Sequence, residues 1–169
     1  MFFQAWAYLY RRWSRIRTGF VRLWKNYLYQ SFLATAIIFI VLLILSAEHV
    51  VVVASIGSTA FIIFTMPKNI TARPRRVIGG HMVGLFSGSL CALIQHPSVL
   101  TTMVVYALAV GISICLMVAL DFEHPPANGT ALGIAITGFS PGLMLAVLTS
   151  SLLLSMAHYF SKRFIKDLT

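Results

Sequence analysis

The chain has 169 residues, of which 59% are hydrophobic and only 10% are charged. A soluble domain carries about 25% charged residues, so this composition excludes one and indicates an all-α integral membrane protein. The net charge of +9 comes from three Lys/Arg clusters that flank apolar segments, which is the positive-inside pattern and not a nucleic-acid surface.

Residues 1–26 predict an amphipathic helix that lies in the membrane interface. Aromatic side chains recur on one helical face and basic side chains on the other, with Arg17 alone on the aromatic face, where a bend would fit. The aromatic positions are Trp6, Tyr10, Trp13, Phe20, Trp24 and Tyr27, and the basic ones are Arg11, Arg12, Arg15, Arg22 and Lys25. Residues 27–169 then form the transmembrane domain. We expect no cleavable signal peptide, because no long apolar run occurs early.

Six apolar segments follow, and we predict that each crosses the membrane. Their limits are 27–47, 50–66, 77–95, 99–120, 125–139 and 143–160, with the second and fifth short or broken. Six crossings place all 13 basic residues on the side of a cytoplasmic N-terminus. We therefore expect both termini in the cytoplasm and the protein in a prokaryotic inner membrane. In the third segment Gly80, Gly84, Gly88 and Ala92 recur every four positions, a spacing that lets helix backbones approach closely.

The two halves of the chain are similar to each other. Each has a long span, a Glu-His pair, and then a helix rich in small residues: Glu48-His49 precedes residues 57–60, and Glu123-His124 precedes residues 129–131. Three crossings per half give two inverted three-helix repeats, which point to a secondary transporter. Coincidence remains the alternative, because the match is short and needs a gap.

The stretch after the fourth span is the first candidate site. Asp121, Glu123 and His124 lie together there, and ionisable groups are costly near a bilayer. The Pro125-Pro126 pair ends the preceding helix, and residues 128–130 suit a new helix N-terminus. If the repeat is real, two helix N-termini converge, one near residues 57–59 and one near residues 128–130, and their N–H groups favour an anion. The alternative is that these small residues only pack helices together.

Three runs carry a family resemblance: residues 55–60 (Ser-Ile-Gly-Ser-Thr-Ala), residues 73–81 and residues 124–132. Together they resemble the HPP family of integral membrane proteins, named for its His-Pro-Pro tripeptide, over residues 27–160. The resemblance implies transport, since plant chloroplast and cyanobacterial members are associated with nitrite movement, while many prokaryotic members have no assigned substrate. Members are usually described with four spans, whereas we expect six. Asn128 stands where many members have a small residue such as Gly, a change that can alter selectivity.

The hypothesis is a secondary transporter of a small anion, nitrite first, that is not an enzyme and has no cofactor and no bound metal. The expected substrate-binding residues are Ser55, Gly57, Ser58, Thr59, Gly79, Gly80, His81, His124, Pro125, Pro126, Asn128, Gly129 and Thr130. His81 or His124 would carry a proton with the anion, because imidazole titrates near neutral pH. The expected gate or ion-pair residues are Arg73, Arg75, Arg76, Asp121 and Glu123, and a purely structural clamp is the alternative for them. The expected partners are the lipid bilayer, the anion and protons, with no nucleic acid and with a homo-oligomer left open.

Three other functions stay open. A cation or metal carrier would use carboxylates and imidazoles, which are suitable ligands. Its residues would be Glu48, His49, His81, Asp121, Glu123 and His124. An intramembrane enzyme would use Ser55 or Ser58 with a histidine, but the chain has no nucleophile-elbow or His-Glu-x-x-His pattern. A non-catalytic scaffold would not need acidic and histidine residues at helix breaks.

Overall fold

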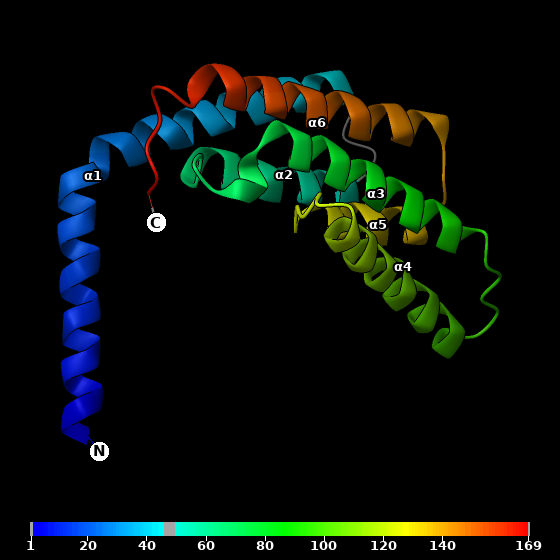
Figure 1. The fold of residues 1–169 in the computed structure, drawn as a ribbon, viewed down its shortest axis with the longest axis horizontal. Coiled ribbons are helices and arrows are strands. Elements are labelled where there is room, and N and C mark those ends of the chain that lie inside the picture. Colours follow the sequence, from blue (N-terminus) through cyan, green and yellow to red (C-terminus); the bar gives the residue numbers. More distant parts are fainter. Residues whose placement is uncertain (1, 46–49, 169) are drawn as a thin grey trace.

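The protein is a bundle of helices (Figure 1). The computed structural model describes residues 2–45 and 50–168, and these ranges contain six α-helices, one short 3-10 helix (η1) and no strand. The elements are α1 (Phe2–Leu45), α2 (Val50–Thr65), η1 (Ile70–Ala72), α3 (Pro74–Ala92), α4 (Val99–Ala119), α5 (Ala127–Thr137) and α6 (Pro141–Ser161). α3 packs against α4, α5 and α6, and α2 packs against α1, α5 and α6. The predicted all-α membrane fold is confirmed for the described residues.

α1 is one continuous helix, with no break at residue 26, because no proline interrupts it. Figure 1 shows its N-terminal part running away from the bundle and its later part turning to lie along the bundle. Trp6, Tyr10 and Trp13 expose about 70% of their surface in this outlying part. An aromatic helix that leaves the bundle fits an interfacial position, and the division at residue 26 stays a prediction.

Three helices are long and apolar enough to cross a membrane among the described residues: Val21–Leu43 within α1, α4 and α6. α3 has 19 residues, about 28 Å of helix, but it carries two arginines, a histidine, four glycines and two serines. α5 has 11 residues, about 17 Å of helix, against the roughly 30 Å of a bilayer core. Six full crossings and the inverted repeat therefore stay predictions, and Glu48-His49 of the repeat lies outside the described residues.

One end of the bundle gathers the loop before α3 and the C-terminal segment. The N–H of Leu168 donates to the carbonyl of Thr65 at 2.8 Å, and the N–H of Lys68 donates to Asp167 Oδ1 at 3.1 Å. Arg76 at the start of α3 pairs with the loop that follows α4, so that loop lies at this end too. The second and third basic clusters thus lie at one end, as the positive-inside pattern predicts.

Two buried polar residues that the sequence analysis did not single out hold this end together. Gln30 of α1 donates its side-chain amide to the carbonyl of Phe64 and, at 2.8 Å, to that of Lys166. His158 of α6 is buried and lies 2.9 Å from the carbonyl oxygen of Pro67. Buried polar groups must be paired. Each of these two side chains therefore joins its helix to backbone carbonyls at the end of, or beyond, a neighbouring helix.

The glycines of α3 allow the closest helix approach in the bundle. A Cβ at Gly84 would overlap the carbonyl oxygen of Ala127, and one at Gly88 would lie 2.5 Å from the carbonyl oxygen of Ala131. A Cβ at Gly80 would lie 2.6 Å from the Cβ of His124. The four-residue spacing therefore does place backbone against backbone, between α3 and α5 and between α3 and the loop before α5.

This packing predicts opposite effects for the same substitution at two helical glycines. Gly84→Ala would overlap α5 and should lower the free energy of unfolding by about 1–3 kcal/mol. Gly111→Ala on α4 meets no atom within 4 Å, so it should leave stability unchanged or raise it by up to about 1 kcal/mol. Thermal unfolding of the purified protein in detergent measures both, and equal melting temperatures would contradict the packing.

Candidate functional site

Five buried polar side chains meet between α2, α3, α5 and the loop before α5. They are Ser55, Thr59, His81, His124 and Thr130, and each is at most 4% exposed. Three stretches that are distant in sequence, α2, α3 and the loop with α5, therefore contribute to one cluster beside the apolar core. Polar groups in such a place are costly unless they are hydrogen-bonded, so the contacts among them decide what the cluster can do.

The hydroxyl of Thr59 lies at the centre of this cluster. Its Oγ1 is 2.9 Å from Nε2 of His81 and 2.9 Å from Nε2 of His124, so one oxygen bridges both imidazoles. It also lies 3.0 Å from the carbonyl oxygen of Ser55, one turn earlier in α2. The two ring centroids are 5.2 Å apart, and the rings therefore communicate through this hydroxyl.

The contacts continue from each ring. Nδ1 of His124 lies 2.9 Å from the carbonyl oxygen of Thr71 in η1. Nδ1 of His81 lies 2.9 Å from Oγ1 of Thr130, which lies 2.8 Å from Oγ of Ser55. Ser55 Oγ in turn lies 2.6 Å from the carbonyl oxygen of Pro126. The result is one string of hydrogen-bonding atoms with a backbone carbonyl at each end, which we call the Thr59 string.

Helix N-termini do not form the site in the way the sequence analysis predicts. The prediction of a helix start near Gly57 is wrong, because α2 begins at Val50 and runs unbroken to Thr65. Residues 128–130 do lie in the first turn of α5. The N–H groups of residues 127–129, however, donate to the carbonyls of residues 124–126 at 2.9–3.1 Å. Pro126 has helical backbone dihedral angles, which bring those carbonyls within reach. The first N–H groups of α5 are therefore already hydrogen-bonded and are not free to bind an anion.

An ion-pair cluster lies beside the string at the basic end of the bundle. Arg76 is nearly buried and donates to both Asp121 and Glu123. Arg75 lies 3.5 Å from Asp121 and over the ring of Phe122 at 5.2 Å. Asp121 has a φ of +58°, and this left-handed residue ends α4 and directs the chain toward α3. The guanidinium of Arg76 therefore holds the His124 loop against α3.

The remaining predicted residues have other surroundings. A Cβ at Gly79 would lie 2.5 Å from the ring of Phe122, so Gly79, like Gly80, gives the His124 loop room to approach α3. Gly129 packs against Ser55, and a Cβ added at Gly129 would lie 3.2 Å from the Cβ of Ser55. Asn128 has a buried side-chain oxygen without a hydrogen-bond partner among the described residues. Arg73 is exposed before the first residue of α3, and its gating role stays a prediction.

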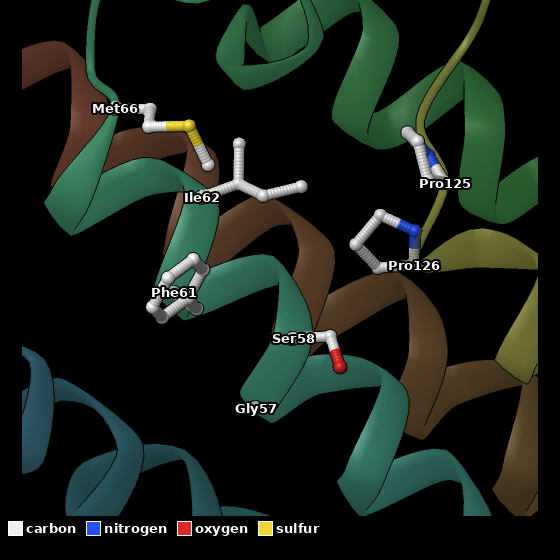
Figure 2. Close-up of a pocket in the computed structure, with 7 residues that line it drawn as sticks. All are labelled: Gly57, Ser58, Phe61, Ile62, Met66, Pro125 and Pro126. Carbon is white, nitrogen blue, oxygen red and sulfur yellow. The ribbon is translucent and has the colours of Figure 1, made fainter. Parts of the chain in front are cut away.

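A groove of about 690 Å³ lies between α2 and the Pro125-Pro126 pair, and Pro126 also belongs to the string (Figure 2). Figure 2 shows α2 on one side of it and the two prolines of the His-Pro-Pro run on the other. Its lining residues are Gly57, Ser58, Phe61, Ile62, Met66, Pro125 and Pro126. Two motifs about 70 residues apart thus face each other, as predicted site residues should. The walls formed by Phe61, Ile62 and Met66 and the carbonyl of Thr71 escaped the sequence analysis, because neither apolar residues nor backbone atoms carry a chemical signature.

The described residues offer little to a metal or to a serine nucleophile. They contain no group of three or more His, Cys, Asp or Glu that could hold a metal ion, and Glu48 and His49 lie outside them. Among the described contacts, Ser55 meets Thr130 and Pro126, and Ser58 meets the carbonyl of Ala54. Neither serine has, among these contacts, a partner that could act as its general base.

The fold and the buried polar cluster define a helical integral membrane protein with a potential solute site. The family model described as "HPP, transmembrane region" matches residues 20–167. The chain therefore belongs to the HPP family, as the three motifs indicated. The match begins inside α1, so the outlying first part of that helix is not covered by it.

Two curated proteins are similar to part of the chain. Both are described as transmembrane proteins of Dictyostelium discoideum, at 38% identity over 88 residues and 34% over 85 residues. Those matches cover 52% and 50% of this chain, but only 31% and 27% of the relatives. The chain thus matches about a third of the length of each. No solved structure matches it.

The ion-pair cluster predicts two very different coupling energies. We expect a coupling of about 1–2 kcal/mol between Arg76→Gln and Glu123→Gln in a double-mutant cycle, since Arg76 is nearly buried. The cycle of Arg75→Gln with Asp121→Asn should give less than about 1 kcal/mol, because both side chains are more than half exposed. Unfolding free energies of the four single and two double variants measure these values. Equal couplings would mean that Arg76 does not hold the loop.

Proposed function

We propose that this protein carries a small anion, nitrite first, across the membrane together with a proton. The observation that carries the proposal is the position of the groove beside the Thr59 string. The groove and the string share the Pro126 segment and neighbouring turns of α2, where Ser55 and Thr59 face the string and Gly57 and Ser58 face the groove. A solute in the groove would therefore contact the same two segments, α2 and the Pro126 stretch, that contribute to the string.

The composition of the groove explains why a proton is part of the proposal. Its lining has one hydroxyl, that of Ser58, and no basic side chain. A bare anion would lose its hydration there without gaining a counter-charge, which is unfavourable. A proton taken up at the neighbouring imidazoles would cancel the charge of nitrite. Arg76 meanwhile neutralises Asp121 and Glu123, so their repulsion of an anion is weakened.

The bundle supports a route for the solute between its two short helices. α2 and α5 pack against each other, and the string joins them through Ser55 and Thr130. Short paired helices near the membrane midplane are where secondary transporters place their sites. In this proposal the end that carries the basic clusters faces the cytoplasm, and α2 and α5 act as the matching helices of two inverted repeats.

The other candidate functions remain distinguishable. A metal carrier would need ligands from residues beyond those described, such as Glu48 and His49, and would bind a divalent cation in place of an anion. A scaffold would tolerate loss of the His81–Thr59–His124 contacts without loss of its role. We propose no covalent step, and the protein is not proposed to be an enzyme.

Blocking the groove tests the proposal. In liposomes with an inward proton gradient, we expect the wild-type protein to take up nitrite, and Gly57→Leu to reduce the initial rate at least about tenfold by filling the groove. A Cβ at Gly57 meets no atom within 4 Å, so the fold should persist. Gly111→Leu is the matched control, because Gly111 is also an open helical glycine but lies on α4, away from this groove.

The substrate panel separates the alternatives. Nitrite, nitrate, formate and a divalent metal ion are offered to the same liposomes with and without the gradient. Uptake of the metal ion and of none of the anions would contradict the anion proposal and would indicate a cation carrier. Absence of uptake of every solute by folded wild-type protein would favour the scaffold. Equal rates for Gly57→Leu and Gly111→Leu would move the route away from the groove.

A further inference from the structure

We propose that His81 and His124 together hold one exchangeable proton and that the Thr59 hydroxyl passes it from one imidazole to the other. The proposal deepens the proposed function and rests on it only for the use of the proton in transport. Its structural basis is the Thr59 string itself, whose six successive contacts run from the carbonyl of Pro126 to that of Thr71.

The string determines which ring nitrogens carry hydrogen when both imidazoles are neutral. The carbonyl of Thr71 can only accept, so Nδ1 of His124 must be the protonated nitrogen of that ring. Its Nε2 is then an acceptor that faces the hydroxyl of Thr59. Since Thr59 has one hydrogen, it can donate to Nε2 of His124 or to Nε2 of His81, but not to both at once.

The same reasoning from the other end of the string fixes the tautomer of His81. The carbonyl of Pro126 can only accept, so Ser55 donates to it at 2.6 Å. The oxygen of Ser55 then accepts from Thr130, whose oxygen accepts from Nδ1 of His81. Both neutral rings therefore carry hydrogen on Nδ1, and the contact left without a hydrogen is one of the two between Thr59 and an Nε2 atom.

One added proton satisfies every contact of the string. Three hydroxyls and two neutral rings supply five hydrogens for six contacts, and a sixth hydrogen completes them. It lies between Thr59 and the two Nε2 atoms, where the neutral string has one hydrogen for two contacts. The sixth hydrogen makes one ring an imidazolium. The contact of Thr59 with the carbonyl of Ser55 only increases the shortage of hydrogens.

Both positions of this proton are compatible with all six contacts, and Thr59 connects them. With the charge on His81, its Nε2–H donates to Thr59, whose O–H donates to Nε2 of His124. The Nε2–H bond of His81 breaks as that hydrogen bonds to the Thr59 oxygen, while the Thr59 O–H bond breaks and its hydrogen bonds to Nε2 of His124. The charge has then moved to His124, and no atom or electron is gained or lost.

The surroundings favour one exchangeable charge over two. Burial disfavours an imidazolium, and two such ions 5.2 Å apart would repel each other. The described titratable or charged groups on the packed elements are Arg75, Arg76 and Cys91 of α3, Asp121 and Glu123 of the loop, His158 and Tyr159 of α6, Tyr106 and Cys115 of α4, and the arginine, lysine and tyrosine residues of α1. Arg75 and Arg76 pair with Asp121 and Glu123, so this cluster contributes no net charge of its own.

Nitrogen-15 NMR of histidine-labelled protein in liposomes tests the proposal without any transported solute. The ring signals are assigned with His81→Gln and His124→Gln. At neutral or higher pH we expect the same tautomer in both rings, with hydrogen on Nδ1 of His81 and on Nδ1 of His124. On acidification we expect the pair to bind one proton per chain, with exchange between the two rings. Because no solute is needed, nitrite transport can fail while this result stands.

Thr59 variants complete the test. Thr59→Ser keeps the bridging hydroxyl and should keep the Nδ1 tautomers and the exchange. Thr59→Val keeps the branched shape without the hydroxyl, and it should abolish exchange between the rings. Hydrogen on Nε2 of either neutral ring in the wild-type protein, two protons bound at once by the folded protein, no proton bound before unfolding, or unchanged exchange in Thr59→Val would each overturn the proposal.

Discussion

The close approach of α3 to the loop before α5 is the constraint on which the site depends. Gly79 and Gly80 leave no side chain between α3 and residues 122–124, so the backbone of that loop rests on the helix. His81 follows them directly in the sequence and meets His124 across this contact. A larger residue at these glycines would separate the two rings by more than one hydroxyl can bridge. Helix packing and the chemistry of the site therefore have a common cause.

The three motifs that carry the family resemblance supply complementary parts of this arrangement. Residues 55–60 provide the hydroxyls of α2, and residues 73–81 provide the arginines, the glycines and the first imidazole. Residues 124–132 provide the second imidazole, the prolines and Thr130. None of the three could form the Thr59 string alone, because each contributes at most one end of any contact between segments.

Charge is separated from the neutral polar groups within the bundle. Arg76 holds Asp121 and Glu123 at the end where the basic clusters gather, and these carboxylates keep part of their contact with the surroundings. Only hydroxyls, imidazoles and carbonyls lie deeper in the string, and they are paired with one another. This division avoids a permanent charge in the buried site while leaving groups that can accept a proton.

The sequence by itself determined the membrane class, the family, the approximate helix limits and most residues that line the site. Apolar runs, proline breaks and glycine spacing act locally, and a single chain displays them. It failed at Gly57, where small residues resembled a helix start but lie inside α2. Only the tertiary structure decided that Thr59 bridges His81 and His124, that Arg76 takes both carboxylates, and that the N–H groups of α5 are already used. The physical reason is that hydrogen-bond partners depend on distances between segments far apart in the chain, which no local pattern encodes.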